Sequence, residues 1–538
     1  MTAIKRPSHL WIGVLCLLFA PAFMIWAAVT DQFFRYWVYA TAPIMSLILL
    51  GIWWSLFSPG SAGRRLVGVV LAVALVGIVF GVLFRPAGSS GGSSLPRFVW
   101  RWAADPGSDV ASLTPVTPPQ TASDPSTSED VAETLATPEG ALDSLQFLGP
   151  ERDGVIPNIQ LDPDWESNPP EILWKQPIGL GWSSFSVRGG RAVTTEQRET
   201  DELTTCYELA TGQLLWQHVH ESTRFSESMG GDGPRSTPTI EVRPDGNDRV
   251  YVLGGTGILD CLELETGKPI WTRNVLEDAG APNLEWATTA APLLIPNDLI
   301  VVSGGNKTGP ELIAYSRDTG DEVWRSGDHG GSYSSPRLVD IDGVSTILHV
   351  HGIGVAGHSP VDGKKFWDVP WGNKMPRVAQ PQVLPNRRVL MTGSYNHNSH
   401  LFQLGAPVDE GAVCEVETLW ESRRMKTKFS SAVIHGEHAY GLDEGMFACI
   451  DLKDGDRVWK DGRYGFGQQL LVEKLILLFS ERGALILIEP TPEEHRELAT
   501  FQVFEKSKCW AAPSLAGRYC LIRSETEAAC VRLPIIAE

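Results

Sequence analysis

Six aromatic and basic residues recur along this chain, each just ahead of a short segment that reads as a strand. They are Trp182, Arg235, Trp286, Tyr333, Lys428 and Trp510. Aromatic rings stack on planar groups, and arginine and lysine attract anions, so these side chains on one rim would bind a planar or anionic ligand. A second interpretation stays open: the aromatics only pack against one another, and the two cations pair with acids such as Glu227 or Asp232.

Three carboxylates in the same segments, Glu227, Asp232 and Glu285, are candidates for a metal ligand or a base. A carboxylate in a glycine-rich loop commonly forms a turn instead. His349 and His351 alternate on one strand face, and an isolated pair lacks a third ligand, so we expect no metal site there. The sequence contains no GxSxG, HExxH, P-loop or Rossmann phrase, and it therefore predicts no catalytic residue.

The elements that position these residues form a repeat. A short phrase that usually contains TG or DG ends in an aromatic residue eight times, at steps of 39 to 55 residues. A period of this size with strand-like flanks indicates a solenoid or a propeller. The aromatic positions are Trp174, Trp216, Trp271, Trp324, Trp367, Trp420, Trp459 and Phe501.

Each repeat reads as four short antiparallel strands, with a turn glycine before the tryptophan strand. We expect this glycine, for example Gly212 or Gly267, to take a positive φ. The last repeat lacks a tryptophan strand, and the segment around Trp174 supplies one without the other three strands. Pairing the two would complete the ring, which predicts an eight-bladed β-propeller over residues 146–538.

The cysteines follow the same repeat. Cys206, Cys261 and Cys449 each lie ten residues before a repeat tryptophan, and Cys530 fits the same position in the last unit. Because Ala314 and Gly357 occupy this position in other units, we expect a small buried residue there instead of disulfides. Pairing of Cys509 with Cys520 across a hairpin remains an alternative.

The first 86 residues read as a membrane anchor. Apolar runs at about 10–29, 36–57 and 66–84 are each long enough to cross a bilayer as a helix. Basic residues before the first run and between the second and third predict a cytoplasmic N-terminus, by the positive-inside rule. Everything after the third run would then be extracytoplasmic, on the periplasmic side of a bacterial inner membrane. Residues 87–145, rich in Pro, Ser, Thr and Gly, predict a disordered linker.

The charge argues against nucleic acid as a partner. The chain has a net charge of −19, and its first 90 residues hold six basic residues and one acidic residue. The remainder therefore carries a net charge of −24. A surface this acidic does not neutralise phosphates.

The repeated phrase TGxxxW on propeller blades resembles the pyrroloquinoline-quinone (PQQ) repeat family. That family includes quinoprotein alcohol dehydrogenases and the propeller subunit of the outer-membrane β-barrel assembly machine. In its dehydrogenases, the resemblance implies PQQ on a tryptophan floor, Ca²⁺ held by acidic and amide side chains, a catalytic Asp and often a ring of two adjacent cysteines. This chain has no adjacent cysteines, and no Ca²⁺ ligand or catalytic Asp can be matched by position.

The sequence thus favours a binding scaffold: a membrane-anchored propeller that holds a small ligand or a protein partner at its rim. A membrane-bound PQQ-dependent dehydrogenase is the alternative, because a several-span anchor before an eight-bladed propeller resembles the family's membrane-bound sugar dehydrogenases. A role in outer-membrane protein assembly is a weaker alternative.

Overall fold

The computed structural model describes residues 18, 45–46, 48–53, 61–89, 96–102, 137–226, 230–306, 308–406, 414–505 and 507–536. The chain divides into two compact units. One comprises Met1–Pro86 and Phe98–Ala103, and the other comprises Ala87–Arg97 and Ala104–Glu538.

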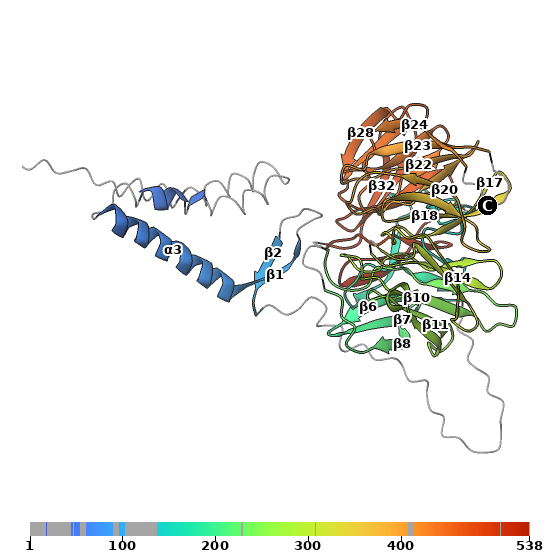
Figure 1. The fold of residues 1–538 in the computed structure, drawn as a ribbon, viewed down its shortest axis with the longest axis horizontal. Helices are drawn as coiled ribbons and strands as arrows, with labels where there is room; N and C mark the ends of the chain where they lie inside the picture. Colours follow the sequence, from blue (N-terminus) through green and yellow to red (C-terminus); the bar gives the residue numbers. More distant parts are fainter. Residues whose placement is uncertain are drawn as a thin grey trace, which may run out of the picture. The chain divides into compact units, whose positions relative to one another are not determined.

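Among the described residues of the N-terminal part, α3 (Ala62–Leu83) is followed by β1 (Phe84–Ser89) and β2 (Pro96–Trp100), which pair as a two-stranded sheet (Figure 1). Residues 45–46 and 48–53 are also helical. The predicted run at 66–84 coincides with α3, whereas most of the other two runs lies outside the described residues. Counting only residues that the structure describes, no helix is long and apolar enough to cross a membrane, and the three predicted spans are not supported.

The predicted linker differs from the structure at both of its ends. Strands β1 and β2 extend into it, because PRFVW carries the β-branched and aromatic residues that favour strands. At its other end, Ser144 bridges Val187, and the Leu145 carbonyl accepts a hydrogen bond from the Ile240 amide at 2.8 Å. Residues 103–136 lie outside the described part of the chain.

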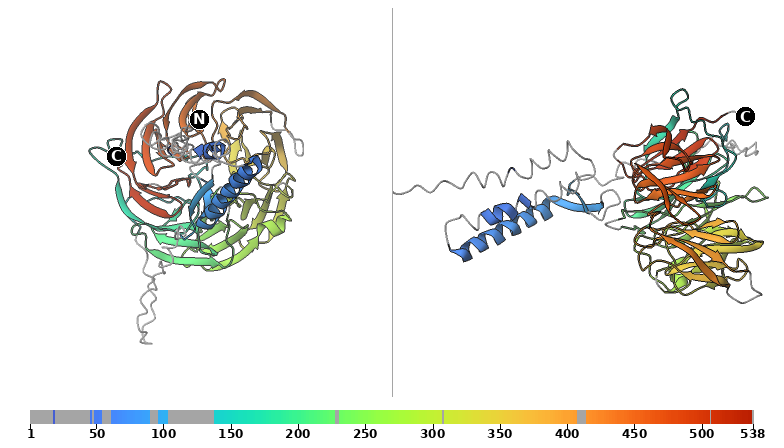
Figure 2. Two further views of the ribbon diagram at one scale, coloured as in Figure 1. Left: turned by 90° about the vertical axis from the view of Figure 1, so that its left-hand side faces the viewer. Right: turned by 90° about the horizontal axis from the view of Figure 1, so that it is seen from above.

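The second unit is an eight-bladed β-propeller, as predicted, and its blades surround a central axis (Figure 2). Blades one to four are built from consecutive strands. From the inner to the outer strand they are β5 (Ser186–Arg188), β6 (Arg191–Arg198), β7 (Asp201–Glu208) and β8 (Leu214–His220); β9 (Thr239–Glu241), β10 (Arg249–Leu253), β11 (Ile258–Glu263) and β12 (Pro269–Asn274); β13 (Leu293–Ile295), β14 (Leu299–Ser303), β15 (Leu312–Ser316) and β16 (Glu322–Ser326); and β17 (Arg337–Ile341), β18 (Val344–Val350), β19 (Gly354–His358) and β20 (Lys365–Pro370). A short helix, α4 (Val275–Ala279), follows blade two.

Blades five to eight continue the same antiparallel order, and two of them recruit a strand from the start of the unit. They are β21 (Gln382–Leu384), β22 (Arg388–Met391), β23 (Ser399–Leu404) and β24 (Val416–Ser422); β25 (Val433–His435), β26 (His438–Asp443), β27 (Met446–Asp451) and β28 (Arg457–Arg463); β29 (Gln468–Val472), β30 (Leu475–Phe479), β31 (Ala484–Glu489) and β32 (Arg496–Gln502), with β3 (Val155–Ile156) added beside β29; and β33 (Ser514–Ala516), β34 (Tyr519–Arg523), β35 (Glu527–Arg532) and β4 (Glu171–Pro177).

The ring closes in blade eight. Strand β4 pairs antiparallel with β35, and Trp174 lies opposite Cys530 in the register. The predicted closure is therefore confirmed. It gives blade eight its fourth strand, so β35 is paired on both sides and β4 forms the outer edge of the blade, as the last strand of each other blade does.

The tryptophan of one blade packs on the turn glycine of the next. A Cβ atom on Gly212 would lie 2.7 Å from Trp174, and one on Gly320 would lie 2.7 Å from Trp271. Both glycines have a positive φ, as predicted. The Trp174 indole also donates to the Leu209 carbonyl at 2.9 Å, so this contact joins stacking to a hydrogen bond between blades. Trp324 packs on Gly363 in the same way, but its Nε1 has no partner among the described residues. The glycine is thus required twice, for its backbone conformation and for the space that the ring occupies.

The same arrangement explains Phe501, which takes the tryptophan position in blade seven. Its neighbour, blade eight, takes β35 and β4 from opposite ends of the unit, so no glycine turn joins them. A tryptophan there would lack both the glycine surface and the turn carbonyl that the other blades offer.

The small-residue position is confirmed as well. Cys206, Cys261 and Cys449 each lie directly opposite the tryptophan of their own blade in the register. All described cysteines are free thiols, so Cys509 and Cys520 do not pair. Eight hydrophobic clusters, each made mainly of residues from two neighbouring blades, form the core between the blades.

Residues 147–156 pass along the centre of the ring. The buried Arg152 side chain donates to the carbonyls of Ala291 in blade three, at 3.1 Å, and Pro336 in blade four, at 3.0 Å, and to Thr239 in blade two. Residues 155 and 156 form β3 and pair with blade seven. This segment therefore fills part of the central channel and holds the inner strands of several blades together.

A pair of glycine substitutions tests the contact between blades. Gly320 and Gly246 both have a positive φ, but a Cβ atom on Gly246 meets nothing within 4 Å. We expect Gly246→Ala to cost about 1 kcal/mol of unfolding free energy from backbone strain alone. Gly320→Ala should cost about 3 kcal/mol, because it also pushes against Trp271.

The measurement is the denaturant midpoint of each variant, compared with the wild type. Equal losses in the two variants would contradict the proposed steric role of the glycine.

Candidate functional site

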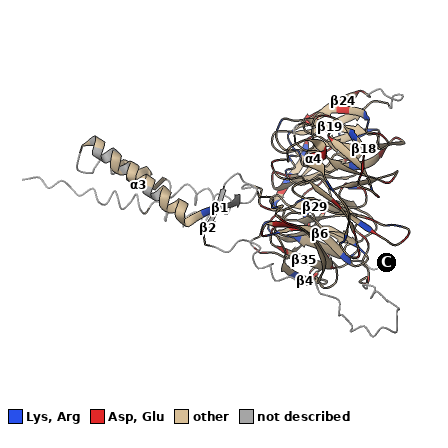
Figure 3. Cartoon of the chain, turned by 60° about the horizontal axis from the view of Figure 1, so that its bottom comes forward, with Lys and Arg blue, Asp and Glu red and all other residues tan. Residues whose placement is uncertain are grey.

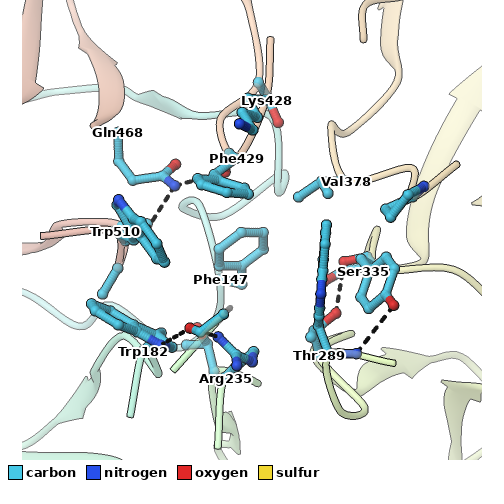
Figure 4. A pocket seen from close by; sticks show the side chains of 18 of the residues that line it. Phe147, Trp182, Arg235, Thr289, Ser335, Val378, Lys428, Phe429, Gln468 and Trp510 are labelled. Carbon is cyan, nitrogen blue, oxygen red and sulfur yellow. Dashed lines mark hydrogen bonds between the residues drawn. The ribbon is translucent and has the colours of Figure 1, made fainter. Parts of the chain in front are cut away.

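The six predicted rim residues line one cavity of about 360 Å³ (Figure 4). They come from the loops that lead into the inner strands of blades one, two, three, four, six and eight. The structure therefore brings the predicted set together. Whether the cavity binds a ligand remains a prediction.

One aromatic wall comes from blades one, six and eight. The rings of Trp182 and Trp510 lie 4.8 Å apart between centroids, and Phe429 lies 4.9 Å from Trp510. Hydrogen bonds fix both indoles: Trp182 Nε1 donates to the Gly230 carbonyl at 3.1 Å, and Trp510 Nε1 donates to Glu481 at 2.9 Å. The wall is consequently preorganised and presents ring faces in a set orientation.

The other aromatic wall comes from blades three, four and five. Trp286 lies 5.2 Å from Tyr333 and 6.0 Å from Tyr395 between ring centroids. The Tyr333 hydroxyl accepts a hydrogen bond from the Trp286 amide at 3.2 Å. Within the described part of the chain, the buried Trp286 Nε1 has no acceptor, so a ligand or a water molecule can supply one.

Basic side chains sit between these walls. The Lys428 ammonium lies over the Phe466 ring at 4.4 Å from its centroid, and burial lowers the pKa of this lysine from its ordinary value. The Arg235 guanidinium donates to the carbonyls of Gly230 and Gly231 at 3.1 and 2.8 Å. Contacts with rings and with the backbone thus help to hold both cations at the cavity.

The acidic candidates do not gather. Glu285 lines the cavity, whereas Asp232 pairs with Arg224 and accepts from the Ser226 hydroxyl at 2.7 Å. Glu227 lies outside the described residues. Of the two candidates that the structure describes, Glu285 lines the cavity and Asp232 does not, so these two do not meet there.

The cavity-lining residues that the sequence did not predict include Phe147, Lys374, Tyr395 and Phe429. Tyr395 lies in the loop between β22 and β23, which reaches the same rim because neighbouring strands are antiparallel. Phe429 directly follows the predicted residue Lys428, so this adjacency could have identified it from the sequence. Phe147 belongs to the segment that passes along the centre, and no repeat pattern points to it.

A buried histidine supports one edge of the cavity. His397 Nδ1 accepts from the Asn373 amide at 3.1 Å, which leaves Nε2–H to donate to the carbonyls of Met375 and Pro376 at 3.1 and 3.0 Å. Met375 and Pro376 line the cavity. Burial, followed by the charge of Arg377, lowers the pKa of His397 to about 4.

The two histidines singled out in the sequence lie elsewhere. Neither lines the cavity. His351 Nε2 lies 3.0 Å from Asp368, while both ring nitrogens of the fully buried His349 lack hydrogen-bond partners in the described structure. They do not form one ligand set, and the sequence interpretation of an isolated pair omitted the residues that surround His351.

The low pKa of His397 predicts a pH-dependent stability. A histidine whose folded pKa lies below its unfolded value favours the unfolded chain once that chain takes up the proton. Stability should therefore fall as the pH drops from about 6.5 towards 4, and His397 should contribute about 2 kcal/mol of the loss between pH 7 and 5.

The check is denaturant unfolding of wild type and His397→Gln at both pH values. The variant should show the smaller pH dependence. If the unfolding free energies of wild type and variant change equally between pH 7 and 5, His397 is not buried in its neutral form.

Comparison with known proteins shows that the chain is similar to PQQ-like repeat proteins. The profile of a family described as outer membrane protein assembly factor BamB matches residues 199–461. The quinohemoprotein alcohol dehydrogenase ADH IIB of Pseudomonas putida is 33% identical over 97 residues, which cover 17% of this chain and 14% of that protein. BamB of Moranella endobia (strain PCIT) is 21% identical over 284 residues, which cover 52% and 69% of the two chains.

The crystal structure of BamB from Moraxella catarrhalis aligns with a TM-score of 0.48 and 12% identity, over 68% of this chain and 100% of that one. The family match and the two sequence relatives confirm the resemblance that the TGxxxW phrase predicted. This chain spans only a small part of the Pseudomonas protein, so no activity is carried over from it.

Proposed function

We propose that this protein is a membrane-tethered binding scaffold whose central cavity receives a planar anionic group. One observation carries the proposal. The cavity has aromatic walls from opposite parts of the ring, and among the described residues its lining includes three cations, Arg235, Lys374 and Lys428, against one carboxylate, Glu285. Ring faces suit a planar group, and the excess of positive charge suits an anion.

The acidic protein around the cavity strengthens its selectivity for anions over other ligands. The chain has a net charge of −19, and acidic and basic residues are interspersed over the propeller (Figure 3). A cationic cavity in an acidic protein is a local exception. Because it is partly shielded from water, a charge pair formed inside it is stronger than one on the surface.

The anion can belong to a small molecule or to a protein that presents it. The Moranella relative is named an outer membrane protein assembly factor, and a role in that assembly remains the weaker alternative for this chain. The lining of the cavity indicates which chemical group it would bind, but not whether that group belongs to a small molecule or to a protein.

A PQQ-dependent dehydrogenase is the second candidate, supported by the match to the Pseudomonas enzyme. The lining residues do not fit its Ca²⁺ requirement. Ca²⁺ takes six to eight oxygen ligands, commonly several carboxylates, whereas this cavity offers Glu285 beside three cations. PQQ itself is planar and anionic, so its binding without Ca²⁺ is compatible with the scaffold proposal.

The tether rests on the sequence alone. The apolar runs within residues 1–86 and their basic flanks support an anchor in a bacterial inner membrane with the propeller outside the cytoplasm. The acidity of the remaining chain agrees with a domain that stays clear of anionic headgroups.

The binding proposal predicts charge-selective affinity. Naphthalene-2,6-dicarboxylate, a planar dianion, should quench the tryptophan fluorescence of the full-length protein and bind more tightly than its neutral diamide. Lys428→Met should weaken dianion binding about tenfold, because it removes a partly desolvated cation.

Lys426→Met is the matched control. Lys426 lies two residues away on the same loop, pairs with Asp443 at 3.6 Å and does not line the cavity. Equal affinities for dianion and diamide, or equal losses in the two lysine variants, would count against the proposal.

The tether predicts a protease pattern. Protease added outside spheroplasts of a bacterial host should cut within residues 103–136 and release a propeller fragment, because the linker sequence is polar and rich in Pro and Ser. Immunoblotting of the supernatant measures the fragment. Cleavage that occurs only after lysis would contradict the proposed orientation.

A further inference from the structure

A second group of polar side chains lies between blades three and four, apart from the cavity. Glu311 precedes β15, His329 lies in the loop after β16, and His351 follows β18. One ligand atom of each, a carboxylate oxygen or an imidazole nitrogen, lies within 4.8 Å of the other two. We propose that these three residues bind a divalent transition-metal ion, with His358 as the fourth ligand.

The distances converge on Glu311. Its Oε1 lies 2.9 Å from His329 Nδ1 and 3.9 Å from His351 Nδ1. Its Oε2 lies 3.6 Å from His358 Nε2. Four ligands that surround a tetrahedral ion at about 2 Å stand a little over 3 Å from one another. Glu311, His329 and His351 already offer atoms within 4.8 Å of one another, whereas His358 approaches the other oxygen of Glu311 and must move towards the group to complete it.

Two of these atoms have no other role in the described structure. Both side chains are 0% exposed, and yet Glu311 Oε2 and His358 Nε2 make no hydrogen bond. Burying an unsatisfied carboxylate oxygen beside an unsatisfied imidazole nitrogen is costly. A shared cation would satisfy both atoms at once.

The outer sides of two imidazole rings are fixed as a metal site requires. His351 Nε2 lies 3.0 Å from Asp368, and His358 Nδ1 lies 2.9 Å from the Ser326 hydroxyl and 3.2 Å from the Gly363 carbonyl. A ring that donates one N–H to a carboxylate, hydroxyl or carbonyl presents its other nitrogen as a lone pair, which is the usual arrangement in histidine metal sites. In both rings that other nitrogen faces Glu311, and in His351 it also accepts a 3.5 Å hydrogen bond from the Ile353 amide.

Lys365 is the competing explanation. Its ammonium lies 2.8 Å from Glu311 Oε1 and also pairs with Asp368, so it already supplies positive charge to one oxygen. The lysine side chain is 20% exposed and keeps Asp368 as a partner if it moves outward. The Lys365 ammonium makes no hydrogen bond to Glu311 Oε2 or His358 Nε2, so these two atoms still lack partners.

The donor set selects the ion. Three imidazoles and one carboxylate suit Zn²⁺ and its neighbours Co²⁺, Ni²⁺ and Cu²⁺, whereas Ca²⁺ and Mg²⁺ prefer oxygen ligands. We therefore take Zn²⁺ as the probe, with Co²⁺ as its visible-absorbing substitute. This site is independent of the cavity, because none of its residues lines that cavity.

The test uses the full-length protein, stripped with EDTA and equilibrated with Zn²⁺. Elemental analysis should find about one Zn²⁺ per chain, and Co²⁺ should give the intense visible bands of a tetrahedral site. His329→Gln and His351→Gln should each weaken binding at least tenfold, and Asp368→Asn 10- to 100-fold. Lys365→Met should leave binding equal or tighter.

The matched control is His220→Gln, in a similar group where His220 lies 2.6 Å and His218 lies 3.8 Å from Asp260. It should leave Zn²⁺ binding unchanged. His329 is 36% exposed, so its variant should fold even if His351→Gln does not. The proposal would be overturned if the wild-type protein retains no Zn²⁺. It would also be overturned if His220→Gln abolishes Zn²⁺ binding and His329→Gln does not.

Discussion

The contact between a tryptophan ring and the turn glycine of the next blade holds this propeller together. A single four-stranded blade buries too little apolar surface to be stable, and the tryptophan ring supplies the missing partner across most gaps between blades. The contact also fixes the angle between neighbouring blades, because the indole donates to a carbonyl of the same turn, as Trp174 does to Leu209. Closure by β4 makes the last gap equivalent to most of the others.

The site follows from this regularity. Because the inner strands repeat around one axis, the loops before them end on one rim, and their sequences are free to differ. Blades one, six and eight contribute Trp182, Phe429 and Trp510, while the opposite blades contribute Trp286 and Tyr333. The segment around Arg152 ties the inner strands together and brings Phe147 into the cavity. A rigid frame with variable rim loops is a general route to a preorganised binding site.

Repeating features were predictable from the sequence because spacing alone defines them. The tryptophans, the turn glycines and the small residues opposite the tryptophans have the predicted positions, and they gave the blade number and the rim. Features that depend on one particular contact were not predictable. Tyr395 reaches the rim from a loop further along its blade, and Asp232 pairs with Arg224 because of the path of its own loop.

The metal-ligand group was hidden for the same reason. Glu311, His329 and His351 come from three segments of two blades, and no spacing in the chain marks their approach. The pair His349 and His351, which spacing does mark, is not the pair that meets. Repeats therefore reveal the frame, while the chemistry that lies between blades requires coordinates.

Calorimetric titration of the full-length protein with PQQ, with and without Ca²⁺, distinguishes a binding scaffold from a dehydrogenase. The account predicts Ca²⁺-independent binding that Lys428→Met weakens, with no reduction of an artificial electron acceptor by added alcohols or sugars. Tight binding only in the presence of Ca²⁺, accompanied by alcohol- or sugar-dependent reduction of the acceptor, would contradict the binding-scaffold account and establish a dehydrogenase.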